Sequence, residues 1–257
     1  MNGLRTKHCG GLLESKSSFL GLTFALLSLA CVSSCGGGGS GGSNSGSGGV
    51  NASNLSSAPG GSIFGDYLQK PGQTALVATD DSGNSYTLDV EISPYSGITT
   101  FNNVFNVYET EIFLTLQKNG VIALQAMTND FYLLNPYQPV GSAGVTLTPY
   151  QVVVSSNPLP STLNIGDSGP LYSATTYHDP NKTALDGTEI ATYTVMENDA
   201  TTIRLCFDST ISGVTTQGTA DGLADGTESD CYSVDSSGNM QLIGVAITAG
   251  AVTLDFH

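Results

Sequence analysis

The sequence predicts an all-β fold, an antiparallel sandwich or barrel that follows a flexible N-terminal segment. Helical periodicity is almost absent after residue 60, whereas period-two alternation recurs in short runs that are rich in β-branched and aromatic residues. Glycine, asparagine, aspartate and proline separate these runs, as in antiparallel sandwiches and barrels. Residues 61–257 are long enough to bury a sizeable core.

Residues 1–34 have the pattern of a secretory signal peptide. Three basic residues precede the apolar run 19–32, which fits the central region of a signal and is too short for a membrane span of about 20 residues. Cys35 follows, and after it comes a run of Gly, Ser and Asn that cannot pack a core. Residues 35–60 are therefore expected to form a flexible tether that spans roughly 25–30 Å.

The sequence Val32-Ser33-Ser34-Cys35 resembles the lipobox of bacterial lipoproteins, in which the cysteine is lipidated and becomes the new N-terminus. Gly36 replaces the aspartate that would act against sorting to the outer membrane in that family. Together with the Gly-rich tether, this resembles outer-membrane lipoproteins of β-proteobacteria. The resemblance implies acylation (palmitate) of Cys35 and a lipid anchor in the outer membrane, on its periplasmic or its cell-surface side.

Strands are expected along the whole folded part. The clearest hairpin joins 105–116 to 121–127, because Asn119-Gly120 lies between them and both turn positions need a positive φ. Residues 81–84 and 236–239 are expected to form two further tight turns. The other expected strands cover 74–79, 85–92, 131–134, 145–154, 171–177, 189–196, 202–207, 231–234, 240–247 and 251–256.

The folded part is expected to consist of two β units, 61–157 and 158–257, divided at Pro158-Leu159-Pro160. The units could be related, because residues 130–135 and 230–235 have parallel sequences, each downstream of a turn. A competing alignment through the Ser-Gly-Asn turns leaves this duplication open.

The charge balance excludes one class of partner. Removal of the signal peptide leaves four basic residues against 21 acidic ones, a net charge of about −17. Such a surface repels phosphate backbones, so nucleic-acid binding is not expected.

Cys206 and Cys231 remain as a pair once Cys35 is lipidated. In an oxidising cell envelope such a pair predicts a disulfide. A zinc site is the alternative, but two cysteines without a nearby histidine make a poor one.

Three stretches carry candidate chemistry. Gly166-Asp-Ser-Gly-Pro170 resembles the nucleophile motif of trypsin-like proteases with one glycine missing, but the only histidine upstream is His8, in the signal peptide. It is therefore expected to be a polar turn, and His178 a loop residue. The acidic stretch after residue 220 could bind calcium, although its spacing differs from the EF-hand loop. Its candidate ligands are Asp221, Asp225, Glu228 and Asp230.

The function expected from these features is a lipid-anchored, non-catalytic module of the cell envelope, with a structural or binding role. Its expected partners are the membrane, through the anchor, and another protein. No cofactor is expected other than calcium. A surface-exposed receptor or adhesin is one alternative, and an envelope enzyme is another that no catalytic motif supports.

Overall fold

The computed structural model describes residues 55–145, 149–250 and 252–257. The predicted signal peptide, Cys35 and most of the tether lie outside the described residues. Ser57–Pro59, at the end of the predicted tether, forms a strand instead. This strand, β1, pairs with β9 (Thr162–Asn164). Its central residue, Ala58, is buried against the rest of the fold.

The predicted all-β architecture is confirmed. The described residues contain a 13-stranded antiparallel sheet. Along its main path the strands have the same order as in the chain, with β4 (Thr99–Phe101) and β9 outside the path. In order along the path these are β2 (Gly72–Thr79), β3 (Ser85–Pro94), β5 (Val104–Lys118), β6 (Val121–Leu133), β7 (Gln138–Gly144), β8 (Tyr150–Ser156), β10 (Ser168–Tyr177), β11 (Leu185–Glu197), β12 (Thr202–Ser212), β13 (Gly226–Asp235), β14 (Met240–Ala249) and β15 (Val252–Phe256).

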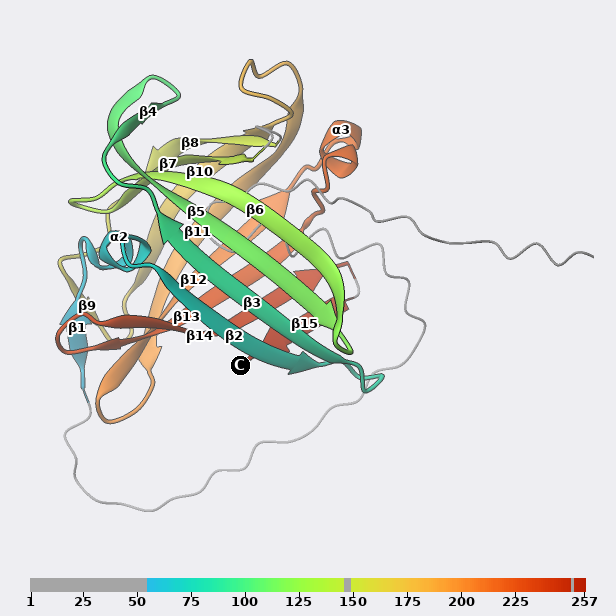
Figure 1. Ribbon diagram of the computed structural model, residues 1–257. Coiled ribbons are helices and arrows are strands. Elements are labelled where there is room, and N and C mark those ends of the chain that lie inside the picture. Colours follow the sequence, from blue (N-terminus) through green and yellow to red (C-terminus); the bar gives the residue numbers. More distant parts are fainter. Residues whose placement is uncertain (1–54, 146–148, 251) are drawn as a thin grey trace, which may run out of the picture.

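The sheet curls into a nearly closed barrel (Figure 1). Its first and last strands meet at one point, where the backbone N–H of Val77 donates to the carbonyl of His257 at 3.1 Å. The N–H of His257 donates back to the carbonyl of Val77 at 3.0 Å. Both predicted β units belong to this sheet, because β8 of the first pairs directly with β10 of the second.

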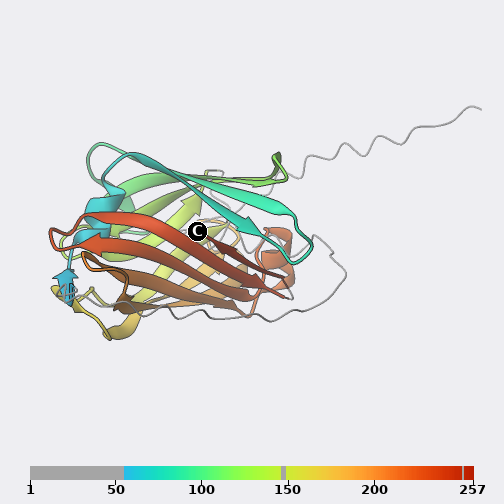
Figure 2. The ribbon, with the colours of Figure 1, turned by 90° about the horizontal axis from the view of Figure 1, so that it is seen from below.

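In the described part of the chain, two short helices lie at opposite ends of the barrel (Figure 2). Helix α2 (Ile63–Leu68) buries Ile63, Phe64 and Leu68. Helix α3 (Thr216–Ala220) lies in the connection between β12 and β13, and Thr215 caps it by accepting from the N–H of Gly218. The remaining strand, β4 (Thr99–Phe101), forms a hairpin with the start of β5.

The predicted turns are confirmed. Asn119 and Gly120 have φ of 52° and 76° and join Lys118 directly to its cross-strand partner Val121. Residues 81–84 connect β2 to β3, and residues 236–239 connect β13 to β14. In these turns a carboxylate of the preceding aspartate, Asp80 or Asp235, accepts backbone N–H groups, so side-chain hydrogen bonds set the chain direction.

Several strand predictions were wrong. The short strands β4 and β9 were not expected, β8 begins at Tyr150 and not at residue 145, and β13 begins at Gly226 and not at Cys231. Residues 131–133 are the end of β6, not the start of a separate strand, and 138–144 form β7 where no strand was expected. The sequence Gln-Pro-Val-Gly-Ser-Ala-Gly of β7 has little strand propensity. Its small residues have a packing role, because a Cβ at Gly141 would lie 2.3 Å from Cε1 of Phe101.

The core has parts on both sides of the barrel wall. Two clusters of buried side chains share Phe207 and Met240 at their margins, and together they contain the apolar residues on the inner faces of most strands. A third cluster includes Phe101, Phe131 and Tyr150. Because Phe131 and its neighbour Tyr132 point to opposite faces of β6, this third cluster lies on the outer face, beneath β4.

Candidate functional site

One part of the barrel's inner wall is polar. On β3, β5 and β14 the buried face of the sheet consists mainly of Leu, Ile and Val. On β6 to β13, by contrast, buried positions also carry acidic and amide side chains. These include Asp130, Gln151, Glu189, Glu228 and Asp230, all at most 5% exposed.

Glu189 lies at the centre of a buried hydrogen-bond network. Its carboxyl accepts from the hydroxyl of Tyr172 at 2.7 Å and from the side-chain amide of Gln151 at 2.7 Å. Burial raises the pKa of Glu189 to about 7, and the two hydrogen bonds oppose that rise only in part. The side chain is therefore poised to bind a proton near neutral pH.

Glu228 and Asp230 are neighbours on the buried face of β13. Burial raises the pKa of Glu228 well above its ordinary value, and the nearby carboxyls of Asp230 and Glu189 raise it further. The carboxyl of Glu228 also shares a side-chain hydrogen bond with that of Asp230, which requires one of the two groups to hold a proton. None of the described Lys or Arg side chains is buried beside them.

Buried tyrosines surround these carboxyls. Burial raises the pKa of Tyr137, Tyr172 and Tyr232 well above the ordinary value, and the adjacent acidic groups add to the effect. Burial and Asp230 raise the pKa of Tyr67 on α2 to about 12. This part of the interior therefore places tyrosine hydroxyls with raised pKa values beside two carboxyls, Glu189 and Glu228, whose pKa values are also raised.

The structure separates the four candidate calcium ligands. Glu228 and Asp230 lie inside the barrel. Asp221 follows α3, and Asp225 accepts the backbone N–H of Val214 at 3.0 Å. Among the residues that the structure describes, no three His, Cys, Asp or Glu side chains are grouped to hold a metal ion.

Sequence reasoning missed a polar cluster at the α3 end of the barrel. Nδ1 of His178 lies 2.7 Å from Oδ2 of Asp221, and Gln217 donates to the same carboxylate at 3.0 Å. The hydrogen bond and charge of Asp221 raise the pKa of His178. Beneath them Asp186 is fully buried, and its pKa rises to about 7 through burial and the proximity of Asp221.

This cluster holds α3 against the barrel. His178 and Asp221 are 43 residues apart in sequence, so no local spacing indicates their contact. The carbonyl of Asp186 accepts the N–H of Thr215 at 2.9 Å, and a Cβ at Gly218 would lie 2.2 Å from that same carbonyl oxygen. Gly218 therefore permits the close approach of the helix.

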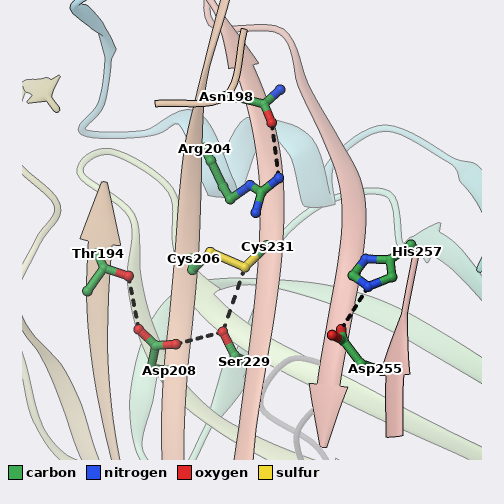
Figure 3. Close-up of a disulfide and its surroundings, with 9 residues drawn as sticks. All are labelled: Thr194, Asn198, Arg204, Cys206, Asp208, Ser229, Cys231, Asp255 and His257. Atoms are coloured by element: carbon green, nitrogen blue, oxygen red, sulfur yellow. Dashed lines mark hydrogen bonds and ion pairs between the residues drawn. A yellow bond between two sulfur atoms is a disulfide. The ribbon is translucent and has the colours of Figure 1, made fainter. Parts of the chain in front are cut away.

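The predicted Cys206–Cys231 disulfide is confirmed (Figure 3). It joins directly opposed residues of β12 and β13, whose Cα atoms are 4.1 Å apart. On one side of it, Asp208 accepts from Thr194 and Ser229. The two cysteines are separated by 25 positions in the sequence, and loop entropy then gives a stabilisation of roughly 3–4 kcal/mol.

The protease-like stretch 166–170 is a turn that leads into a strand, as predicted. Gly166 has φ of 93°, and Ser168 is the first residue of β10. Asp167 accepts the backbone N–H of Asn164 at 2.8 Å, which closes the turn. The stretch therefore has a structural role in the start of β10.

Large apolar side chains are exposed around the β4 hairpin, which projects beyond the barrel wall in Figure 1. Tyr95, Ile98 and Phe105 are 47%, 57% and 71% exposed. All three lie in the short segment that leads from the end of β3 through β4 into β5. We call these three residues the hairpin surface. Grouped apolar exposure of this kind is typical of interaction sites.

The comparisons add no relative. No protein-family model, no curated protein and no solved structure matches the chain. In the described part of the chain, no helix has the length and apolar character needed to cross a membrane.

Proposed function

We propose that this protein is a lipid-anchored, non-catalytic module of the cell envelope that acts by binding a partner protein. The observation that carries the proposal is the hairpin surface, where Phe105 is 71% exposed at the end of a rigid barrel. Burial of a Phe or Ile side chain in an interface contributes about 1.5–3 kcal/mol, so Phe105 and Ile98, together with the aromatic ring of Tyr95, can anchor a complex.

The anchor part of the proposal rests on Cys35 and its lipobox-like context. Replacement by alanine, Cys35→Ala, should move the protein from the membrane fraction to the soluble fraction of the envelope and abolish labelling with a palmitate analogue. Ser34→Gly, which keeps a small residue before the cysteine, is the matched control and should remain in the membrane. A Cys35→Ala protein that is still acylated and membrane-bound would contradict the anchor.

Photo-crosslinking in cells tests the binding role. A benzophenone amino acid in place of Phe105 should give a discrete crosslinked product, whereas the same group in place of Ile190 should not. Ile190 is a fair control because it is 60% exposed but lies on the barrel wall, in β11. Ile98→Ser should reduce the product made from position 105.

Two outcomes of that experiment decide the proposal. Equal crosslinking from the two positions would mean that the hairpin surface has no dedicated partner. A product that contains a protein from outside the cell would favour the surface receptor or adhesin over an internal envelope role.

A further inference from the structure

The barrel wall is split between β7 and β8. The two strands share only the register pairs Gly141–Val152, Ser142–Gln151 and Ala143–Tyr150. Both strands continue beyond the Gly141–Val152 pair, β7 back to Gln138 and β8 on to Ser156. The residues beyond that pair, 138–140 and 153–156, line a groove of about 200 Å³. The groove therefore lies where two neighbouring strands diverge.

The β8 side of this groove is an open strand edge. On its other side β8 stays paired with β10, through Val153–Ala174, Ser155–Ser173 and Ser156–Tyr172. Val154 has no register partner on either neighbour, and its side chain is 70% exposed. Val154 is the extra residue of a β-bulge, which interrupts the alternation of backbone groups at that position. From Ser155 onward, the backbone groups that do not face β10 face the groove.

The two edges of the groove are not equivalent as templates. Pro139 lies in the middle of the open part of β7 and has no N–H to donate. The open part of β8 contains no proline, so it can both donate to and accept from an added strand. An incoming segment would therefore pair with β8.

The groove lining specifies the chemistry of that segment. Val104 and Leu133 lie along it with Val140 and Val153, and the remaining lining residues are neutral. A charged side chain in the groove would therefore lose water without gaining a partner. The chain as a whole carries a formal charge of −15, which favours basic residues in the parts of the partner that lie outside the groove.

We propose that this groove binds an extended, uncharged segment of a partner protein, which adds as a strand to the edge of β8 at residues 153–156. Main-chain hydrogen bonds would supply affinity, and the alternate side chains of the segment would contact Leu133, Val140 and Val154. The inference rests on the proposed binding function and gives that function a second contact site with a stated ligand chemistry.

A synthetic peptide tests the assignment. The probe is a nine-residue peptide of alternating Val and Thr with two Lys at each end, and its binding to the full chain is measured by fluorescence anisotropy. We expect saturable binding that Val154→Lys weakens at least about tenfold. Ile190→Lys, at a similarly exposed position on a strand that is paired on both sides, should have no effect. The same peptide with N-methyl groups on alternate residues should not bind, because it cannot form the ladder.

Several results would overturn the groove assignment. They are no binding of the unmodified peptide up to about 1 mM, equal binding of the N-methylated peptide, and equal weakening by the two lysine variants. Dimerisation that depends on Val154 in the absence of peptide would assign the groove to a second copy of the chain instead. If crosslinking from position 105 persists while the peptide fails to bind, the proposed function stands and only the groove assignment fails.

Discussion

Replacement of Phe64 by alanine is expected to lower the free energy of unfolding by about 4 kcal/mol, the range for a fully buried phenylalanine. Phe64 is 5% exposed and brings α2 into the end of the barrel. Its ring lies 4.7 Å from that of Phe207, 5.1 Å from Tyr137 and 5.4 Å from Tyr232. Truncation would remove three edge-on aromatic contacts at once and leave a void that rigid strands cannot close.

The measurement is chemical denaturation of the wild type and the variant under identical conditions. Phe105→Ala is the matched control, because the same atoms are removed from a side chain that is 71% exposed, and a change within about 0.5 kcal/mol is expected. A loss in Phe64→Ala no greater than in the control would mean that α2 does not contribute to the core. Since the hydroxyl of Thr110 also holds the carbonyl of Leu68, α2 need not detach completely in the variant.

Turns and strands were predicted correctly from the sequence where local chemistry determines the structure. Asn119-Gly120 forms its tight turn because both residues tolerate a positive φ, and this needs no tertiary partner. The strands on either side alternate because one face of β5 is buried and the other faces solvent. The pairing of Cys206 with Cys231 was predictable for a different reason, because the predicted cleavage and lipidation at Cys35 would leave only these two cysteines to form a disulfide.

The prediction failed where the buried face is not apolar. Glu228 and Asp230 share parity with Tyr232 and Val234, which are buried on the same face of β13. That alternation was a usable signal, but carboxyl groups usually indicate a solvent-exposed loop, so the strand was expected to begin only at Cys231. The two acids are buried because β13 runs through the polar part of the inner wall. That position of β13 depends on the tertiary structure.

Contacts between segments that are distant in the sequence could not be predicted either. The barrel brings His178, after β10, next to Asp221, after α3, and nothing in either local sequence indicates the other. The β7–β8 groove is a similar case, because it depends on the point at which the pairing between these two strands stops. Strand propensity describes each strand separately and contains no information on such divergence.

The folded protein is expected to be more stable at pH 5 than at pH 8, the reverse of a protein held together by ionised carboxylates. Burial raises the pKa of Glu189 from 4.5 to about 7, so the folded state holds a proton that the unfolded chain releases over this range. Because the folded state binds more protons, stability falls as pH rises from about 4.5 to about 7. For Glu189 the loss between pH 5 and pH 8 is about 2–3 kcal/mol.

The groups that face Glu189 determine the sign and the size of this effect. Tyr172 and Gln151 donate to it and reduce the rise in its pKa, whereas Glu228, whose own pKa is raised well above normal, acts in the same direction as Glu189. At still lower pH the trend reverses. Asp80 and Asp235 have lowered pKa values because asparagine side chains donate to them, and their contribution is lost as pH falls through those values.

The variant Glu189→Gln isolates the carboxyl, and urea denaturation between pH 4.5 and pH 8 provides the measurement. The amide oxygen of the variant can still accept from Tyr172, and its NH₂ can donate to Oε1 of Gln151 once the Gln151 amide turns by 180°, since its Nε2 faces Glu189 in the wild type. The fall in stability with pH should therefore become shallower by about 2–3 kcal/mol without loss of the fold. Glu91→Gln, on the exposed face of β3, should keep the wild-type slope. An unchanged slope in Glu189→Gln would show that Glu189 is ionised in the folded barrel, and the fall in stability with pH would then come from Glu228 or Asp186, whose pKa values burial also raises.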